Sequence, residues 1–495
     1  MNAPDAAILR PDTAAAGVDR LFANQQSAAL HYPCPTAAER IAHLKALRRQ
    51  IQRYQDVLAQ AMCADFGYRS PAESKMLDEL GTVLELNHAI AHLRRWMKPS
   101  RRSTELLFLS NSVKVHYQPK GVVGIIVAWN FPVYVALGPL VATLAAGNRA
   151  MIKMSEYTPA TTAVVRRMLA EIFSERQVAV VGEELLDPGH FSALPFNHIV
   201  FTGSPAVGRA VMGAAAKNLT PVTLELGGKS PAVVGRSYPV ADAAVRITHG
   251  KSTNCGQICV SPDYALVPCE RVDAFVAAAK DGFARFYGGQ TEHNEHYSGI
   301  IHERHFQREL ALLDDARAKG ARVEACGPLP VTGSRQLPLH IVCNATPNMR
   351  VMQEELFGPI LLVVPYDTLD QAIAFIHERA RPLALYCFSH DASERDELLR
   401  RTHSGGVTIN DWGWHAFNHD APFGGIGNSG MGSYHGVEGF RELSHARTVF
   451  KRHRFFPTGL FHPPYGTAVQ QLVLRLFLGK ADPAVQAKQP TRAKS

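Results

Sequence analysis

Apolar residues recur at helical spacing in the first part of the chain. The positions concerned are Ile41, Leu44, Leu47, Ile51, Tyr54 and Leu58. This spacing predicts a helix from about residue 37 to about residue 64, and Thr36 with Glu39 matches a capping box at its start. A second long helix is predicted from Ser74 to Met97, ahead of Pro99. Residues 1–20 are expected to be loosely ordered.

From residue 113 onward, short apolar runs alternate with helical segments. Strands are predicted over 113–118, 122–127, 150–154, 178–181, 198–201 and 222–226, with helices over 133–146, 160–173 and 206–216. A second segment has predicted helices near 241–254, 271–287 and 304–319, and strands near 263–267, 322–325 and 361–364. Apolar strands separated by helices indicate parallel sheets covered on both faces. This α/β architecture binds nucleotides at the carboxyl ends of its strands.

The stretch 121–147 has no charged residue and is long enough to span a bilayer. It contains Asn130, Pro132 and Pro139, and a polar break at this depth would leave backbone groups unpaired in lipid. We therefore favour a buried strand, a loop around Asn130 and a buried helix. In that interpretation Asn130 lies at the carboxyl end of a central strand, where ligands bind, and we expect no stable membrane insertion.

Composition narrows the class of protein further. The chain has 495 residues, 46% hydrophobic and 19% charged, which indicates a globular protein of two or three domains. Lys and Arg total 52 against 44 Asp and Glu, a net charge of +8 that is spread along the chain without a recognisable nucleic-acid-binding module. We expect no nucleic-acid partner.

The eight cysteines are far apart and form no CxxC pair. They do not resemble a disulfide framework, and residues 1–20 do not resemble a signal peptide. A reducing, cytoplasmic location is the expectation, and the pattern suggests no metal site.

Two segments carry reactive side chains. The segment 254–259 (NCGQIC) places glycine before Cys259, which allows a tight turn, and a cysteine with a lowered pKa or a nearby base is a nucleophile. Taken alone, Cys259 is more often a small buried hydrophobe. The segment 224–231 (LELGGKSP) places Glu225 in an apolar strand. A buried carboxylate suits general base catalysis, and a buried salt bridge with Lys229 is the equal alternative.

Two further segments suggest a nucleotide. The segment 201–208 (FTGSPAVG) follows a strand and opens a helix, where a pyrophosphate can meet the helix N-terminus. It lacks the G-x-G-x-x-G fingerprint and can equally be a plain turn. The segment 354–359 (EELFGP) has two acids beside an aromatic residue, which suit a ribose, although a solvated acidic turn is the simpler interpretation.

Together these segments resemble the aldehyde dehydrogenase superfamily over roughly residues 20–465. The segments 422–432 (PFGGIGNSGMG) and 434–436 (YHG) resemble its class 3 branch. The segments 221–223 (PVT) and 261–264 (SPDY) are similar to its coniferyl aldehyde dehydrogenase group. The resemblance implies a variant Rossmann cofactor domain, an α/β catalytic domain and a β-strand oligomerisation arm.

The resemblance also implies roles. Cys259 matches the nucleophile that attacks the aldehyde, Glu225 the base that activates water for thioester hydrolysis, and Asn130 the oxyanion donor. Lys153 and Glu156 match the adenosine ribose contacts. The remaining implied cofactor contacts are Trp129, Gly203, Ser204, Val207, Glu355 and Phe357. Glu156 would repel a 2′-phosphate, so NAD is favoured and NADP is the less favoured alternative.

The substrate wall is expected from aromatic residues, namely Tyr134, Trp412, Trp414 and Phe417, with a packed surface loop as the equal alternative for 411–417. Such a wall suits a hydroxycinnamic aldehyde such as coniferaldehyde. The alternative is a medium- or long-chain aliphatic aldehyde. A low-ranked hypothesis is that Cys255 and Cys259 come close enough to oxidise to a disulfide.

The implied domain plan follows the same resemblance. Residues 21–226 form the NAD-binding domain, with 108–120 in the oligomerisation arm, and 227–405 form the catalytic domain. Residues 406–440 hold an active-site loop and return to the cofactor domain, and 441–495 complete the arm of a homodimer. The helix predicted over 469–478 is expected to pack on its own subunit, the alternatives being an entrance cap, a membrane contact or a partner contact.

Two functions rival aldehyde oxidation to the acid. One is acyl transfer to coenzyme A, which a water-activating Glu225 opposes. The other is a non-catalytic scaffold, which the presence of all three central residues opposes.

Overall fold

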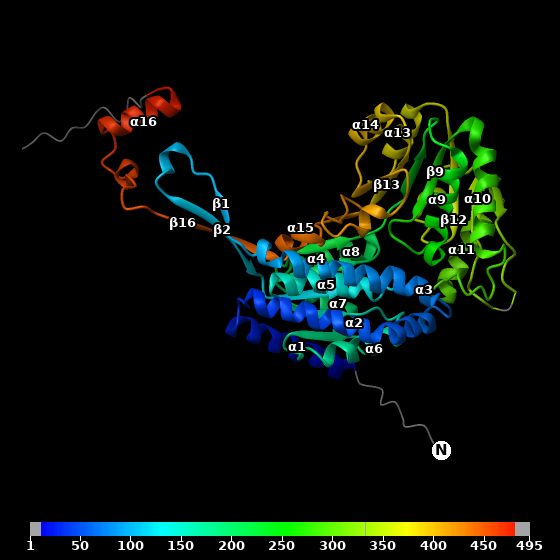
Figure 1. Ribbon diagram of the computed structural model, residues 1–495, viewed down its shortest axis with the longest axis horizontal. Coiled ribbons are helices and arrows are strands. Elements are labelled where there is room, and N and C mark those ends of the chain that lie inside the picture. The colour runs from blue at the N-terminus through cyan, green and yellow to red at the C-terminus, as the bar shows by residue number, and fades with distance from the viewer. Residues whose placement is uncertain (1–10, 332, 481–495) are drawn as a thin grey trace, which may run out of the picture. The chain divides into compact units, whose positions relative to one another are not determined.

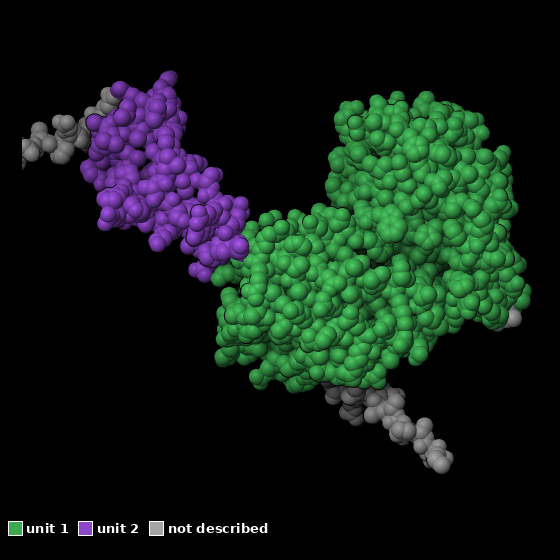
Figure 2. Space-filling model, in the orientation of Figure 1, with its two compact units in different colours: residues 1–97, 117–445 green, residues 98–116, 446–495 purple. Residues whose placement is uncertain are grey.

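The computed structural model describes residues 11–331 and 333–480. The chain divides into two compact units, residues 1–97 with 117–445 and residues 98–116 with 446–495 (Figure 2). The first unit contains two large sheets with helices on their faces (Figure 1), as the alternation of apolar strands and helices predicts.

The first sheet has six strands in the order β15-β7-β6-β3-β4-β5. They are β3 (Val122–Ile126), β4 (Arg149–Lys153), β5 (Val178–Val181), β6 (His198–Thr202), β7 (Val222–Glu225) and β15 (Gly430–Met431). The strands from β3 to β7 run parallel, and β15 joins the edge antiparallel to β7. The carboxyl ends of β3, β6 and β7 therefore meet along one edge.

Both faces of this sheet are covered because its strands are apolar at successive positions. Val123 and Ile125 of β3 join one core cluster, and Val122 and Ile126 pack toward the other. The surrounding helices are α1 (Pro11–His31), α2 (Ala37–Asp65), α4 (Leu80–Trp96), α5 (Tyr134–Ala146), α6 (Pro159–Ala170), α7 (Pro188–Ala193), α8 (Pro205–Ala216) and α15 (Gly436–Glu442). The predicted capping box of Thr36 and Glu39 begins α2.

One expectation for the N-terminal region was wrong, and the second long helix forms as predicted with an earlier start. Residues 11–31 form helix α1, because Val18 and Phe22 pack into the core and the Gln25 side chain donates to the backbone oxygen of Ala150 at 2.8 Å; residues 1–10 lie outside the described part. The second long helix begins at Pro71, as α3 (Pro71–Ser74), and continues through a π-helical turn, η1 (Lys75–Glu79), into α4. Such turns are often found at functional sites.

The charge-free run is a buried strand, loop and helix, as predicted. β3 is followed by the loop that contains Asn130 and then by α5, of which every residue from Val135 to Ala146 is buried. Among the helices of the described residues, none has the length and apolarity needed to cross a bilayer.

The second sheet has seven strands in the order β10-β11-β12-β9-β8-β13-β14. They are β8 (Ser230–Val234), β9 (Pro262–Pro268), β10 (Arg322–Ala325), β11 (His340–Cys343), β12 (Ile360–Tyr366), β13 (Ala384–Phe388) and β14 (Gly406–Ile409). All neighbours are parallel except β10 and β11. β14 extends this sheet past the predicted boundary at residue 405, because its backbone pairs with β13.

Helices cover both faces of the second sheet as well. In β8, Ala232 and Val234 pack with α9 and α10, and Val233 packs with α11, α13 and α14. The helices and short turns are α9 (Val240–Ser252), η3 (Thr253–Gly256), η4 (Cys269–Arg271), α10 (Val272–Tyr287), α11 (Glu303–Ala318), α12 (Arg350–Gln353), α13 (Leu369–His377), α14 (Ala392–Arg401) and η5 (Trp414–Phe417).

The second unit is built around a three-stranded sheet in the order β1-β2-β16. Its elements are β1 (Ser100–Arg102), η2 (Leu106–Phe108), β2 (Ser112–Pro119), β16 (Ser444–Lys451), η6 (Thr458–Phe461) and α16 (Ala468–Leu478). The Phe108 ring lies 5.6 Å from that of Phe456 and 6.3 Å from that of Phe461. In α16, Val469, Leu472 and other apolar side chains are exposed. The expected packing of this helix on its own subunit is therefore not observed.

Candidate active site

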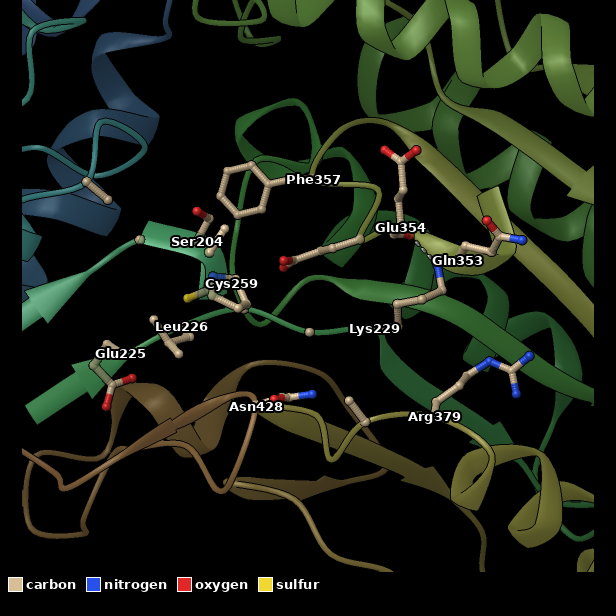
Figure 3. Close-up of a pocket in the computed structure, with 18 of the residues that line it drawn as sticks. Ser204, Glu225, Leu226, Lys229, Cys259, Gln353, Glu354, Phe357, Arg379 and Asn428 are labelled. Atoms are coloured by element: carbon tan, nitrogen blue, oxygen red, sulfur yellow. Dashed lines mark hydrogen bonds between the residues drawn. The ribbon is translucent and has the colours of Figure 1, made fainter. Parts of the chain in front are cut away.

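A cavity of about 1050 Å³ lies at the edge where β3, β6 and β7 end, and segments that follow strands of the second sheet close it (Figure 3). Eight predicted site residues line it: Trp129, Asn130, Gly203, Ser204, Glu225, Cys259, Glu355 and Phe357. They come from five separate segments of the sequence. The fold therefore brings together the motifs that the sequence singled out one by one.

Cys259 lies in the loop between η3 and β9, and an unusual turn at residues 254–256 sets the direction of this loop. Asn254, Cys255 and Gly256 all have positive φ, at 48°, 53° and 74°, which is rare for residues with a side chain. A Cβ on Gly256 would lie 2.3 Å from the backbone oxygen of Gly358. Glycine is therefore required there, because the two backbones touch.

The surroundings of Cys259 keep its thiol protonated. Burial, with smaller contributions from the charges of Glu225 and Glu355, raises the pKa of Cys259 to about 12. A neutral thiol needs to lose its proton before it can attack a carbonyl carbon. The resting site is therefore an uncharged nucleophile close to two carboxyl groups.

Glu225 ends β7 and is buried, with 2% of its surface exposed. Neither carboxyl oxygen has a hydrogen-bond partner among the described residues, and burial raises the pKa of Glu225 well above its usual range. The alternative of a salt bridge with Lys229 is wrong, because the Lys229 ammonium pairs with Asp263 and donates to the backbone oxygen of Glu354 at 2.8 Å. Glu225 is thus a strong base without a competing partner.

Asn130 follows β3, and its side chain is held in place through backbone contacts. Its Nδ2 donates to the backbone oxygen of Gln257 at 3.2 Å, in the same loop as Cys259. A carboxamide nitrogen carries two hydrogens, so this bond leaves one donor for an oxygen bound beside Cys259.

A buried ion pair supports the Asn130 loop, and sequence analysis did not identify it. Arg69 and Asp78 are fully buried and 2.8 Å apart. Arg69 also donates to the backbone oxygen of Asn130 at 3.2 Å, and Asp78 accepts from the backbone N–H groups of Val133 at 3.2 Å and Tyr134 at 3.0 Å. One pair of charges therefore holds both the loop and the start of α5.

We predict that Arg69→Met lowers the free energy of unfolding by about 3–5 kcal/mol, because it leaves the Asp78 carboxylate buried without its partner. Urea unfolding followed by circular dichroism measures this loss. The control is Arg53→Met, which removes an exposed pair with Glu171 and is expected to change the stability by less than about 1 kcal/mol. Equal effects of the two variants would contradict the supporting role of Arg69.

Glu355 and Phe357 approach the nucleophile loop from the segment before β12. A Cβ on Gly227 would lie 2.2 Å from a carboxyl oxygen of Glu355, so glycine allows the carboxyl group to rest on the backbone there. The Phe357 ring lies 5.4 Å from that of Trp129 in an edge-to-face arrangement. His305 of α11 contacts the Phe357 backbone oxygen at 2.9 Å. These contacts fix the predicted ribose segment against the loop after β3.

Glu355 makes the stability of the protein depend on pH. Burial raises its pKa to about 7, so the folded state favours the neutral form, whereas the unfolded chain ionises at lower pH. The fold therefore loses stability as pH rises from the ordinary carboxyl range through 7. We predict that Glu355→Gln stabilises the protein at pH 8 by up to about 3 kcal/mol, and that this gain shrinks at pH 5.

Thermal or urea unfolding at the two pH values measures this difference. Glu354→Gln is the matched control, since Glu354 pairs with Arg350 at 2.9 Å and Arg308 at 3.2 Å. Its loss is expected to destabilise the protein slightly at pH 8. A gain from Glu355→Gln that is the same at both pH values would rule out the titration of Glu355 as its cause.

The remaining predicted cofactor contacts are placed as follows. Ser204 begins α8, where its hydroxyl accepts from the backbone N–H of Val207 at 3.4 Å. Val207 itself is half exposed and does not line the cavity. Lys153 ends β4 and donates to the backbone oxygen of Met154 at 2.7 Å, and the exposed Glu156 follows it. Neither lines the cavity, so their ribose role stays a prediction.

The four predicted substrate residues lie outside this cavity. Trp412 donates to His249 Nδ1 at 2.9 Å, and the exposed Trp414 donates to Asp411 at 2.8 Å, with Phe417 6.0 Å from its ring. Tyr134 is closer to the chemistry, because the charges of Cys259 and Glu225 are among the causes that, after burial, raise its pKa.

Aromatic residues belong to the core cluster against which Cys259 packs. Cys259 and Phe131 are partly buried beside a cluster that contains Phe423 and Tyr434 as well as Trp412, and none of these four rings lines the cavity. Sequence analysis did not single out Phe131, Phe423 or Tyr434, although all three lie in segments that it examined.

Cys255 does not share the surroundings of Cys259. Its thiol is fully buried, 3.5 Å from the Tyr297 hydroxyl and 3.6 Å from the backbone oxygen of Leu337. It does not line the cavity. This placement gives no support to the hypothesis of a disulfide with Cys259.

Basic residues at the cavity are a further feature that sequence analysis missed. Arg209, Arg308, Arg379 and Arg381 line it, and Arg209 donates to Asn428 at 3.1 Å. Such residues, with the N-terminus of α8, suit an anionic ligand. Single arginines spread over some 170 residues give no local pattern that could have identified them.

Comparison with known proteins agrees with this site. A profile of the aldehyde dehydrogenase family matches residues 8–449. The chain is 48% identical to a "Probable coniferyl aldehyde dehydrogenase" of Pseudomonas aeruginosa, over 93% of this chain and 96% of that one. It is 38% identical to "Aldehyde dehydrogenase family 3 member A2" of Macaca fascicularis, over 82% and 83%.

Solved structures show the same fold. The substrate-bound state of Staphylococcus aureus AldH matches with a TM-score of 0.87 at 33% identity, covering 93% of this chain and 99% of that one. An aldehyde dehydrogenase of Mycobacterium tuberculosis complexed with NAD+ matches with a TM-score of 0.79 at 28% identity, covering 88% and 90%. The profile match and the similarity to these relatives show that the chain belongs to the aldehyde dehydrogenase family.

Proposed function

We propose that this protein oxidises an aromatic aldehyde of the hydroxycinnamic class to its carboxylic acid, with NAD as the hydride acceptor. The observation that carries the proposal is that Cys259, Glu225 and Asn130 line one cavity with the N-terminus of α8. The aldehyde and the coenzyme then approach Cys259 from different sides.

The residues divide the chemistry between them. The Cys259 thiol first releases its proton to solvent. The resulting thiolate adds to the carbonyl carbon to give a thiohemiacetal, and the free hydrogen of the Asn130 amide donates to the oxygen that becomes negative. Such a donor contributes roughly 10²–10³ in rate. Loss of hydride from this carbon leaves a thioester on Cys259. Glu225, in its ionised form, then takes a proton from water, the resulting hydroxide attacks the thioester carbon, and Cys259 leaves as a thiolate as the product acid forms.

Features of the cavity fit a dinucleotide. The backbone N–H groups at the start of α8 suit a pyrophosphate, and Glu355, which rests on Gly227, suits the hydroxyls of a ribose. The nicotinamide ring of the bound coenzyme supplies the acceptor for hydride. We propose NAD rather than NADP because the exposed Glu156 would repel a 2′-phosphate. The relative complexed with NAD+ supports this use of the cavity.

The substrate class is supported by a relative. The relative in Pseudomonas aeruginosa carries the coniferyl name. The alternative is a medium- or long-chain aliphatic aldehyde, which the resemblance to the class 3 branch implies.

A panel of kcat/KM values with NAD tests the proposal, using coniferaldehyde, vanillin, benzaldehyde and alkanals of rising length. Coniferaldehyde is expected to exceed hexanal by at least about tenfold, which corresponds to about 1.4 kcal/mol in the transition state. The matched control is benzaldehyde against cyclohexanecarbaldehyde, which have similar size and differ in aromaticity. A preference for alkanals would replace the aromatic class with the aliphatic one.

Hydrolysis rather than acyl transfer is part of the proposal. A base as strong as Glu225, with no competing partner in the described part of the chain, would hydrolyse a thioester before coenzyme A could accept the acyl group. Equal yields of free acid with and without coenzyme A are expected.

We also propose that the protein is a homodimer in a reducing compartment such as the cytoplasm. The edge strand β16 is exposed along almost its whole length, and an exposed edge is suited to pairing with a second copy. All eight cysteines are free, which suits a reducing environment.

A further inference from the structure

Three buried side chains from distant parts of the sequence meet away from the cavity of Cys259. Glu85 lies on α4, His419 follows η5, and His435 precedes α15. One ligand atom of each lies within 4.8 Å of the other two, and the exposed fractions are 3%, 8% and 0%. None of the three lines the cavity.

Four polar side-chain atoms of these residues are unpaired in the described part of the chain. Glu85 Oε2, both ring nitrogens of His419 and Nδ1 of His435 have no hydrogen-bond partner among residues 11–331 and 333–480. Buried polar groups are nearly always paired. One ligand atom from each of the three residues lies near the other two, so a single ligand that accepts lone pairs can serve all three side chains.

The orientation of the His435 ring suits binding to a metal ion through Nδ1. Its Nε2 lies 3.0 Å from the Tyr134 hydroxyl, which fixes the ring and leaves Nδ1 for a second partner. A contact of this kind on the far nitrogen is usual for histidines that bind metals.

We propose that Glu85, His419 and His435 bind a divalent transition-metal cation, with Zn²⁺ the best match. Two imidazoles and one carboxylate form a donor set that zinc accepts, with a fourth position open to water. Mg²⁺ and Ca²⁺ prefer oxygen ligands. This proposal departs from the expectation from sequence of a protein without a metal site.

The test titrates Zn²⁺ alone into full-length protein that has been stripped with a chelator, with isothermal calorimetry as the readout. Cys259→Ala is the parent, because a free thiolate also binds zinc. One Zn²⁺ per chain is expected. His419→Gln and Glu85→Gln in this parent are each expected to weaken binding at least tenfold.

His340→Gln is the matched control. His340 of β11 is also buried and has an unpaired Nε2, but the cluster does not include it. Its substitution is expected to leave zinc binding unchanged. Thermal unfolding shows whether each variant is folded, and Zn²⁺ is expected to raise the Tm of the parent and of His340→Gln only.

The visible spectrum of bound Co²⁺ shows which type of atom binds the metal. Co²⁺ in the parent is expected to give weak visible bands without the charge-transfer band of a thiolate ligand. Absence of zinc binding, a thiolate band, or unchanged affinity in His419→Gln would each overturn the proposal.

Discussion

Cys259→Ala is expected to lower NAD reduction on the order of 10⁵-fold, the scale on which removal of a catalytic nucleophile acts in other enzymes. Without the thiol no covalent intermediate forms, so there is no tetrahedral carbon from which hydride could leave. The fold is expected to persist, because the change removes one sulfur atom at a cavity wall. Steady-state NADH production measures the loss, and calorimetry with NAD shows that the coenzyme site is intact.

Cys255→Ala is the matched control, four residues away. Its thiol faces Tyr297 and Leu337 in the core, so the variant is expected to lose stability while activity per folded molecule stays within a few-fold of the original. Comparable activity losses in both variants would mean that the assignment of the nucleophile is wrong.

Glu225→Gln is expected to separate the two halves of the reaction. Hydride transfer still occurs once per site, because it does not need the base that activates water. Hydrolysis of the thioester is expected to slow by about 10²–10⁴. Rapid mixing should therefore show a burst of one NADH per active site followed by slow turnover.

Mass spectrometry after acid quenching provides the second measurement. The variant is expected to carry the acyl group on Cys259, whereas the original enzyme carries none at steady state. Glu354→Gln, at the rim of the same cavity, is the control and is expected to turn over without a burst. Fast turnover of Glu225→Gln with no trapped acyl group would assign the base elsewhere.

The sequence could predict that the candidate residues lie on one cavity, because two of them end or follow strands of the same sheet. Glu225 closes β7 and Asn130 follows β3, so a parallel sheet brings them to one edge whatever the rest of the chain does. Cys259 and Glu355 were found from short motifs in loops. In each case the information lies within a few residues of sequence.

The supporting residues were not predictable, because their partners lie far away in sequence. Arg69 acts on Asn130, 61 residues later, and neither belongs to a periodic pattern. Helix α1 was missed because most of its apolar residues are alanines, and its Gln25 contacts Ala150, 125 residues away. The tryptophans of the loop 411–417 do not line the cavity for another reason. Composition shows that rings are present and says nothing of the direction in which they point.

The contact between Gly256 and Gly358 has a consequence for how this enzyme can change. It joins the nucleophile loop to the segment of Glu355 through backbone atoms alone. The spacing between these two backbone segments is therefore set by two peptide groups, and side-chain rotamers cannot adjust it. We expect substitutions elsewhere in the cavity to change the substrate range while this backbone spacing stays constant in variants that remain active.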